Sequence, residues 1–395
     1  MRPLLALVSF RRGLVLAAGA AVAVSGLSVA ACAESEPGTN DEPDATHPLP
    51  GLEGEGGPEE AGVDGDADAS PAPIDCSQIA FCPVAAPIPP LVTLNAIWGS
   101  SANDVWAVGT RGTILHGDGS TFQVVPSGTD EIFYGVWGRG PGDVWVTSSR
   151  VPRHARDEVD GGVSWDIVTG STWNEWAQNF GRVWSIWGSS AEDVWLVGTA
   201  SQRFGEPGSI WTKTTIFSGE TVWQTVPAED AHGWSIQPSL RALWGSARDD
   251  IWAVGYGGQA FTYRPASGTW VQHNSRTSAD LTAVWGAGRG DVWAVGQDGT
   301  IRHHTSASDS FHFVESPTKA NLHAIWGSGP SDIWAVGEHG IAVHYDGTAW
   351  KVVDLELGID PLPNLYGIWG AGPDDVWVVG DDVLLHRTKN SRREL

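Results

Sequence analysis

The sequence predicts an all-β protein that folds as a seven-bladed β-propeller with four antiparallel strands in each blade. One phrase, first seen as LNAIWGSSANDVWAVG at residues 94–109, occurs seven times along the chain. Its first tryptophan is followed eight residues later by a second, and an aspartate stands two residues before that second tryptophan. Successive copies are 39, 50, 57, 41, 41 and 43 residues apart, the range of a propeller blade. The first tryptophans of the seven copies are Trp98, Trp137, Trp187, Trp244, Trp285, Trp326 and Trp369.

Each copy can be divided into the strands of one blade. The Leu-x-Ala-Ile-Trp run predicts strand A, the Val-Trp-Ala-Val-Gly run predicts strand B, and shorter runs such as 113–116 and 269–272 predict strands C and D. Strands A and B are apolar at both parities, so we expect both faces to be buried, with the tryptophans filling the core. We expect the repeated aspartates to cap the A–B turns by accepting backbone N–H bonds. Blades should start near residues 94, 133, 183, 240, 281, 322 and 365.

The phrase W-G-x4-D-[VI]-W-x-V-G resembles the Trp-rich propeller repeats of exported bacterial proteins. It is more distantly similar to Asp-box (BNR-type) repeats and to the photosystem II stability/assembly-factor propellers. The stretches 344–350 and 116–122 approximate an Asp box, but its serine is replaced. The resemblance implies the fold over residues 94–395 and no particular function. Sialidase-like chemistry would need an arginine triad and a Tyr/Glu pair, and neither can be placed in this sequence.

Residues 1–31 are expected to form a lipoprotein signal peptide. Arg2, Arg11 and Arg12 make a basic start, and the run 13–31 carries no charge. The ending Val-Ala-Ala-Cys resembles a bacterial lipobox, in which cleavage leaves the cysteine, here Cys32, as the lipidated N-terminus. An uncleaved transmembrane helix is the alternative, since about 18 apolar residues can span a bilayer. The Ala- and Gly-rich composition and the cysteine favour the signal peptide.

These features predict an outer-membrane lipoprotein in the envelope of a Gram-negative-type bacterium, because Ala33 rather than an aspartate follows the cysteine. The arginine pair also resembles a twin-arginine signal, so the export route stays open between that and the general one. The membrane would be contacted through the lipid anchor only.

Residues 32–75 are expected to be a disordered acidic tether. Residues 33–75 contain 13 Asp or Glu and no Lys or Arg, with too little apolar surface to offset the entropy of ordering. Of the formal net charge of −24, the expected propeller at 76–395 carries −14. An acidic domain without a basic stripe repels phosphate backbones, so nucleic acid is not an expected partner.

Cys76 and Cys82 are expected to form a disulfide, because Cys32 is assigned to the lipid and the chain is exported. A two-cysteine metal site is the alternative, but no histidine or third cysteine is close in sequence. His116, His303 and His344 stand eighteen residues after a first tryptophan, and His386 stands seventeen after one. Their places lie in different blades, so we expect semi-exposed strand residues, no metal site and no cofactor.

Two blades carry insertions, which we take as the candidate binding surface. Blade 2 is expected to insert Ser148–Gly162 after strand B, and blade 3 to insert Ala200–Gly208. An Arg-rich pair of adjacent loops in an acidic domain suits an anionic partner, although loops also tolerate insertions without a function. The candidate binding residues are Arg150, Arg153, His154, Arg156, Arg203 and Phe204.

The function that these patterns favour is a non-catalytic binding platform for an unidentified protein or glycan at the cell envelope. A carbohydrate-binding propeller is one alternative, which repeated exposed Trp or Tyr pockets would indicate. A glycosidase- or lyase-type enzyme is the other, which a unique group of acid, base or Arg/Tyr side chains on one face would indicate. No candidate catalytic residue emerges from the sequence.

Ring closure is predicted to use the N-terminal segment. After residues 383–386 the chain becomes too polar for a buried fourth strand of blade 7, and an open edge invites aggregation. In other blades an aromatic on strand D precedes the next first tryptophan by fifteen residues, and Phe81 precedes Trp98 by seventeen. We therefore expect residues near 81–86 to pair antiparallel with residues near 383–388.

Overall fold

The structure is a computed structural model, and it describes residues 75–149, 152–157, 162–167, 182–199, 209–215 and 221–391. These residues belong to one compact unit. The expected signal peptide, Cys32 and the tether up to residue 74 lie outside the described residues. Within the described ranges, no helix combines the length and the hydropathy that crossing a bilayer requires.

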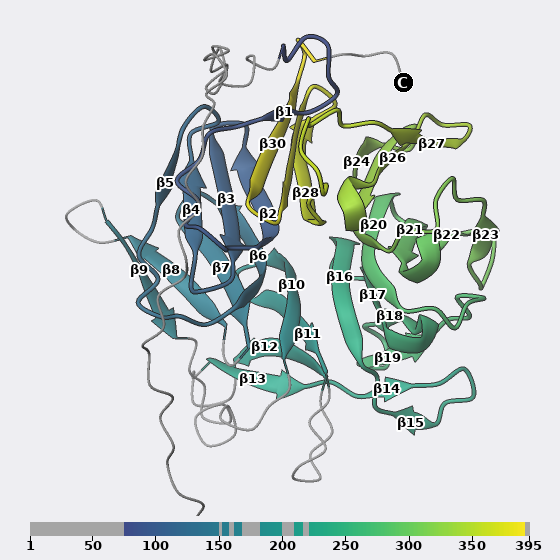
Figure 1. Cartoon of the computed structure of the whole chain (residues 1–395). Coiled ribbons are helices and arrows are strands. Elements are labelled where there is room, and N and C mark those ends of the chain that lie inside the picture. The colour runs from purple at the N-terminus through teal and green to yellow at the C-terminus, as the bar shows by residue number, and fades with distance from the viewer. Residues whose placement is uncertain are drawn as a thin grey trace, which may run out of the picture. The chain divides into compact units, whose positions relative to one another are not determined.

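Seven antiparallel sheets surround a common axis, which confirms the seven-bladed propeller (Figure 1). The innermost strands, called strand A in each blade, contact one another all the way round the ring. Strand A begins at residue 94, 133, 183, 240, 281, 322 or 365, as the repeat predicted. The strands of blades 1 to 3 are β2 Leu94–Ser101, β3 Asp104–Gly109, β4 Ile114–Gly117, β5 Phe122–Val124, β6 Phe133–Gly140, β7 Asp143–Ser148, β8 Arg153–Asp157, β9 Val163–Ile167, β10 Val183–Ser190, β11 Asp193–Gly198, β12 Ile210–Thr215 and β13 Thr221–Thr225. Those of blades 4 to 7 are β14 Ala228–Glu229, β15 Ser235–Ile236, β16 Leu240–Ala247, β17 Asp250–Gly255, β18 Ala260–Arg264, β19 Thr269–Gln272, β20 Leu281–Gly288, β21 Asp291–Gly296, β22 Ile301–Thr305, β23 His312–Val314, β24 Leu322–Gly329, β25 Asp332–Gly337, β26 Ala342–Tyr345, β27 Trp350–Val353, β28 Leu365–Gly372, β29 Asp375–Gly380, β30 Val383–Thr388 and β1 Cys82–Pro83.

The first tryptophan of each phrase packs over a glycine of the next blade. At Gly327 of β24, a Cβ atom would lie 2.7 Å from Cη2 of Trp285 and 2.7 Å from the carbonyl oxygen of Asp332. Only a residue without a side chain permits this approach, which explains why glycine follows the tryptophan in every copy. The seven contacts are Trp98–Gly138, Trp137–Gly188, Trp187–Gly245, Trp244–Gly286, Trp285–Gly327, Trp326–Gly370 and Trp369–Gly99.

Strand B is buried almost throughout, but strand A is not. Strand A is buried at its first and fourth residues in every blade and is only partly covered at most other positions, because its inner side lines the central channel. The expectation that both faces of strand A are buried is therefore wrong. The first tryptophans are half-buried accordingly, whereas every second tryptophan is at most 5 % exposed.

Each second tryptophan meets the edge of an aromatic ring from strand D of the following blade. The ring centroids are 5.2–6.2 Å apart and the planes lie at 67–88°, the arrangement that the ring quadrupoles favour. One such pair therefore joins every blade to its neighbour. The pairs are Trp106–Trp165, Trp145–Trp223, Trp195–Trp270, Trp252–Phe311, Trp293–Trp350, Trp334–Phe81 and Trp377–Phe122.

The repeated aspartates bond to side chains rather than to backbone N–H groups, which corrects the expected turn cap. In blade 1, Asp104 Oδ1 accepts the indole N–H of Trp106 at 3.0 Å and lies 2.8 Å from His116 Nε2. Its Oδ2 accepts the Ser100 hydroxyl at 2.5 Å. In blade 1 the carboxylate thus pairs a buried indole N–H that would be costly to leave unpaired. The equivalent indole N–H of Trp377 in blade 7 has no partner among the described residues.

The strand C histidines complete this arrangement in five blades. Each imidazole stacks on the second tryptophan, with centroids 3.6–4.3 Å apart, and bonds to the aspartate through Nε2. His116, His303 and His386 are partly exposed strand residues, as expected. His344 is instead buried at 8 % exposed, and His154 was expected in an inserted loop. The stacking was not foreseen. The five histidines are His116, His154, His303, His344 and His386.

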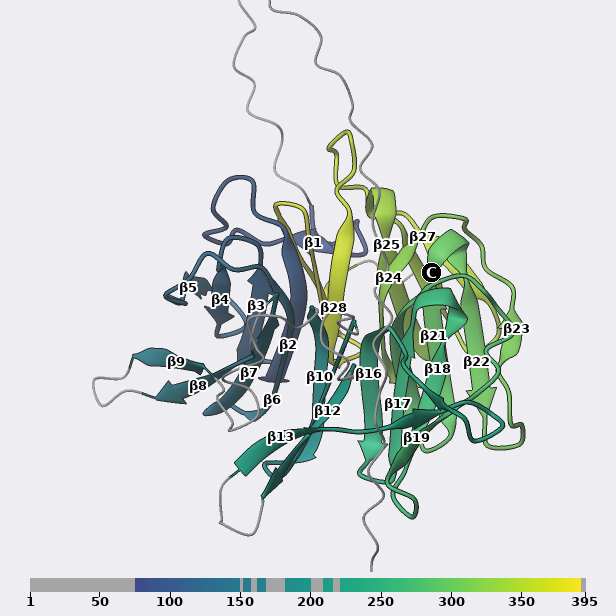
Figure 2. The same cartoon turned by 90° about the horizontal axis from the view of Figure 1, so that it is seen from below.

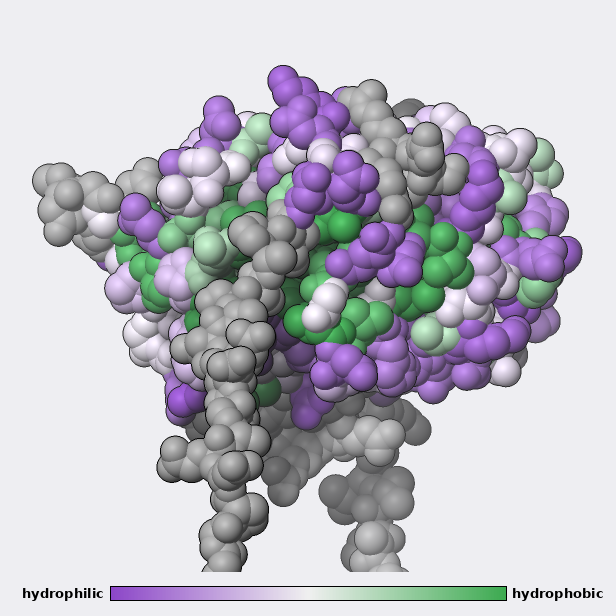
Figure 3. Space-filling view, turned by 45° about the horizontal axis from the view of Figure 1, so that its top comes forward, coloured by the Kyte–Doolittle hydropathy of each residue, from purple (hydrophilic) through white to green (hydrophobic). Residues whose placement is uncertain are grey.

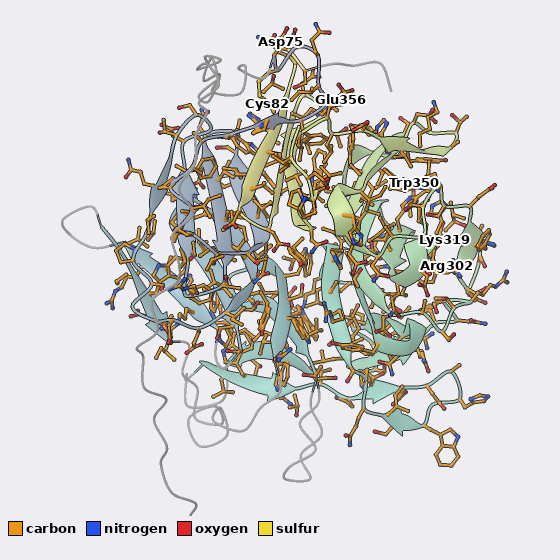
Figure 4. The ribbon with its side chains drawn as sticks, viewed as in Figure 1. Asp75, Cys82, Arg302, Lys319, Trp350 and Glu356 are labelled. Atoms are coloured by element: carbon orange, nitrogen blue, oxygen red, sulfur yellow. A yellow bond between two sulfur atoms is a disulfide. The ribbon has the colours of Figure 1, made fainter. Side chains whose placement is uncertain are left out.

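The N-terminal segment closes the ring as the sequence predicted (Figure 1 and Figure 2). Strand β1 pairs antiparallel with β30, opposing Cys82 to His386 and Pro83 to Leu385. Phe81 is fully buried and supplies the strand D aromatic of blade 7. The Cys76–Cys82 disulfide is present beside this strand, at the top of Figure 4.

Blade 4 departs from the four-stranded pattern. The hairpin β14–β15 precedes it in sequence, and β14 pairs parallel with the outermost strand β19, which makes a six-stranded sheet. Connections from strand D to the next strand A share one face of the ring with the B–C turns. We call this side the connector face.

Candidate functional site

The second residue of strand A takes six identities in the seven blades, with tyrosine twice, whereas the two tryptophans and the aspartate of the phrase never change. It lies at a β-bulge in all seven blades, where one extra residue interrupts the pairing of strand A with strand B. Bulges re-aim a side chain and are common next to functional sites. The seven residues are Asn95, Tyr134, Trp184, Arg241, Thr282, His323 and Tyr366.

These residues stand at the mouth of the central channel on the connector face, because strand A starts there. A cavity of about 250 Å³ is lined by strand A residues of six of the seven blades, so it lies on the axis. Asn95, Tyr134, Trp184, Arg241 and Tyr366 are among its walls. Two residues further along each strand lies an aliphatic ring whose members are 6–8 % exposed: Ile97, Val136, Ile186, Leu243, Val284, Ile325 and Ile368. All of them except Val284 and Ile325 line the cavity and form its floor.

One side of the mouth holds an arginine between aromatic rings. The Arg241 guanidinium carbon lies 4.1 Å from the ring centroid of Trp184 and 5.5 Å from that of Tyr256. Arg241 Nη1 donates to the Tyr256 hydroxyl at 2.9 Å. The ring of Tyr134 lies 4.4 Å from that of Trp184 and extends the aromatic wall. Stacking fixes the plane of the guanidinium and leaves its edge N–H groups for an acceptor.

The other side of the mouth is aromatic and acidic. His323 stacks on Tyr366 with centroids 5.0 Å apart. Burial lowers the pKa of His323, so the imidazole is neutral at pH 7. Burial raises the pKa of Tyr366, and the negative charges of Asp381 and Glu338 act in the same direction. The mouth is therefore electrically uneven, with a cation on one side and carboxylates on the other.

The arrangement suits binding rather than metal chemistry. Among the described residues, no three His, Cys, Asp or Glu side chains are grouped as metal ligands. The His–Asp pairs that resemble acid–base machinery are repeated in five blades and are stacked on buried indoles, so they serve the fold. The residues that vary from blade to blade at the second position of strand A are instead those of the channel mouth.

The predicted binding residues of blade 2 are placed differently from the expectation. Residues 153–157 form strand β8, so the B–C connection spans only 149–152, and the expected insertion Ser148–Gly162 is wrong. The extra length lies instead between β9 and β10, at 168–182. Strand 153–157 corresponds to strand C of the other blades. His154 has the same spacing from Trp137 as His386 has from Trp369, and each histidine stacks on the second tryptophan of its own blade.

The blade 2 side chains that are described have partners within the fold. Arg153 is 8 % exposed, and its Nη2 lies 3.3 Å from Glu131 Oε1. His154 bonds to Asp143 at 2.7 Å. Arg156 is 61 % exposed and pairs with Asp166 at 3.2 Å on the adjoining strand. Only Arg156 presents a largely exposed charge.

The remaining predicted binding residues, Arg150, Arg203 and Phe204, lie outside the described residues. In blade 3 the connection from β11 to β12 spans 199–209 and so contains the expected insertion. The sequence reasoning missed the channel mouth, although a signal was present: position x of Leu-x-Ala-Ile-Trp takes six residue types in seven blades, whereas the tryptophan never changes.

Comparison with known proteins supports the fold. No protein-family model matches the chain, and no curated protein matches it. Among solved structures, YCF48 bound to D1 peptide is similar, with a TM-score of 0.58 and 20% identity over 78% of this chain and 96% of that one. A streptogramin B lyase has a TM-score of 0.57 and 16% identity over 79% of this chain and 98% of that one.

An extracellular domain from B. thetaiotaomicron, belonging to the putative one component system BT4673, is also similar. Its TM-score is 0.58 at 13% identity, over 78% of this chain and 40% of that chain. At these identities the likeness shows the propeller fold alone.

Proposed function

We propose that this protein is a non-catalytic binding module that is anchored in the cell envelope through lipidated Cys32 and binds a protein partner with the connector face of its propeller. Nine large apolar side chains of the described residues are exposed, and five of them lie on connections from strand D to the next strand A. The other four lie on outermost strands. The five connector residues are Leu91, Ile132, Trp234, Ile359 and Leu362.

This asymmetry carries the proposal. Exposed apolar groups that gather on one face mark an interaction surface, whereas scattered ones need no explanation. Trp234 is 73 % exposed at the tip of the β14–β15 hairpin, and Leu91 is 83 % exposed. Apolar residues also gather near the centre of the space-filling view, between hydrophilic ones (Figure 3). The solved propeller YCF48, which holds a D1 peptide, is a precedent for peptide binding by this fold.

The carbohydrate-binding alternative has less support. Repeated exposed Trp or Tyr pockets were its expected sign, but the repeated tryptophans are buried or half-buried. Trp234 is the only largely exposed tryptophan in the ranges that the structure describes.

The test compares two triple variants of the full chain. The first changes the connector face by Leu91→Asn, Ile132→Ser and Trp234→Ser; asparagine is chosen because Leu91 has a φ of 61°. The matched control removes exposed apolar groups from outermost strands by Val124→Ser, Phe313→Ser and Val352→Ser. Both proteins are crosslinked in the native envelope, and captured partners are quantified by mass spectrometry.

We expect the connector variant to capture at least tenfold less of a specific partner, which the wild type and the control capture in equal amounts. Equal capture by both variants, with both melting like the wild type, contradicts the proposal.

A further inference from the structure

The channel mouth holds a cation that the fold does not neutralise. Arg241 makes one hydrogen bond, to Tyr256, and no carboxylate of the described residues lies within ion-pair distance of it. Arg182 lies 5.5 Å from the same Trp184 ring and likewise has no described ion-pair partner. Of these two arginines, Arg241 lines the cavity, where the rings of Trp184 and Tyr256 hold its guanidinium. A guanidinium held by stacking is ready to bind a planar anion through two parallel N–H groups.

The rest of the cavity selects the body of that anion. The walls are the rings of Tyr134, Trp184 and Tyr366, and the floor is the aliphatic ring below them. Trp184 also has a buried indole N–H without a hydrogen-bond partner among the described residues. The lining is polar as well as aromatic, because Asn95, Ser185 and Arg241 stand among the rings. A few such polar groups fix the orientation of the bound molecule in small-molecule sites. The cavity of about 250 Å³ limits the occupant to a compact molecule.

The opposite side of the mouth restricts the charge. Asp381 and Glu338 act electrostatically on Tyr366 there. Their oxygens already accept hydrogen bonds from neutral partners: the Thr93 hydroxyl and Asn364 amide for Asp381, and the Asn321 amide for Glu338. Two acidic side chains at this side of the mouth disfavour a second negative charge close by. A single carboxylate fits these surroundings better than a doubly charged phosphate.

We propose that the mouth of the channel binds a small carboxylate with an aromatic or apolar body, anchored by Arg241 and stacked between Tyr134, Trp184 and Tyr366. The site lies inside the ring of connector residues and is separate from them. It does not depend on the protein partner proposed above. The same chemistry is offered by a free organic acid and by the terminal carboxylate of a peptide, which the experiment separates.

The test measures binding of defined probes to the full mature chain by isothermal titration calorimetry. Phenylacetate is compared with phenylacetamide, which lacks the charge, with phenyl phosphate, which can carry two charges, and with acetate, which lacks the apolar body. We expect phenylacetate to bind at least tenfold more tightly than each of the other three. Equal affinities of phenylacetate and phenylacetamide, or no binding of phenylacetate at 10 mM (roughly the weak limit of specific ligand binding), overturn the proposal.

Variants locate the site. Arg241→Gln should weaken phenylacetate binding at least tenfold, and Arg241→Lys should restore only part of it, because an ammonium cannot bind the carboxylate through two parallel donors. The matched control is Arg248→Gln in the same blade, whose side chain is 77 % exposed on the A–B turn, at the opposite face. It should bind like the wild type. Unchanged binding by both Arg241 variants, each melting like the wild type, overturns the assignment.

Two further arms complete the design. A short peptide that ends in a phenylalanine carboxylate is compared with its amidated form. If the free-carboxylate peptide binds better than the amidated peptide and also more tightly than phenylacetate, the result supports the site and identifies chain termini as the source of the carboxylate. Tighter binding of phenylacetate supports the site with a free acid as its ligand. The triple connector variant should keep its affinity for phenylacetate, so failure of partner capture and failure of this site are distinguishable.

Discussion

Replacing Phe81 by alanine tests how the ring is held closed. Phe81 is fully buried, and its ring meets Trp334 edge-on with centroids 5.2 Å apart. Removing a buried phenylalanine side chain typically costs about 3–5 kcal/mol. A domain of about 320 residues loses roughly 1.5 °C of melting temperature per kcal/mol, because its unfolding entropy scales with length. Phe81→Ala should therefore lower the melting temperature by about 4–8 °C.

The assay is differential scanning calorimetry of the oxidised full chain, with Phe313→Ala as the matched control. Phe313 is 70 % exposed on strand β23, so its loss should change the melting temperature by less than about 1 °C. Since every blade is packed between two neighbours, opening the clasp should shift one cooperative transition of the whole ring. An unchanged melting temperature, or a separate early transition while the main one stays in place, would refute this account of closure.

Three more outcomes are expected. Gly327→Ala should cost about 1–3 kcal/mol by overpacking against Trp285 and the Asp332 carbonyl, whereas Gly329→Ala in the same strand, where an added Cβ meets nothing within 4 Å, should be nearly neutral in chemical denaturation. Burial raises the pKa of Asp332, but hydrogen bonds from His344, Ser328 and Trp334 outweigh burial and hold the pKa below 3.8. The ionised Asp332 therefore stabilises the folded protein at pH values above the pKa of the unfolded chain. This stabilisation is lost as the pH falls through the lower pKa of the folded protein. Asp332→Asn should therefore reduce the fall in melting temperature below about pH 4, and an acid limb as steep as that of the wild type would contradict this. Mass spectrometry of the mature protein should find Cys32 as an acylated N-terminus, and residues 1–31 still attached would contradict the proposed anchor.

Blade number, blade boundaries and the closing strand could be read from the sequence because each depends on local patterns. The two tryptophans and the aspartate recur in every blade, and a blade with two apolar faces needs neighbours on both sides. The spacing of Phe81 from Trp98 matched that of the strand D aromatics closely enough to place β1. The same reasoning erred at residues 153–157, where it treated a strand as a loop, because the extra residues of blade 2 lie after β9.

Features that join different blades required the tertiary structure. Nothing in the order of residues says that Trp285 lies over Gly327, or that Trp334 meets Phe81 across more than 250 residues of chain. The roles of the strand C histidines depended on which face of the strand turns toward an indole.

The candidate site shows the same division. The sequence by itself determined that the second position of strand A takes six residue types in seven blades, while the tryptophan three positions later never changes. Only the closed ring decided that Trp184 and Arg241, 57 residues apart, stack at the axis and share a cavity with Tyr134 and Tyr366. The physical reason is that a repeat encodes the strand and its bulge locally, whereas the channel exists only where seven inner strands meet.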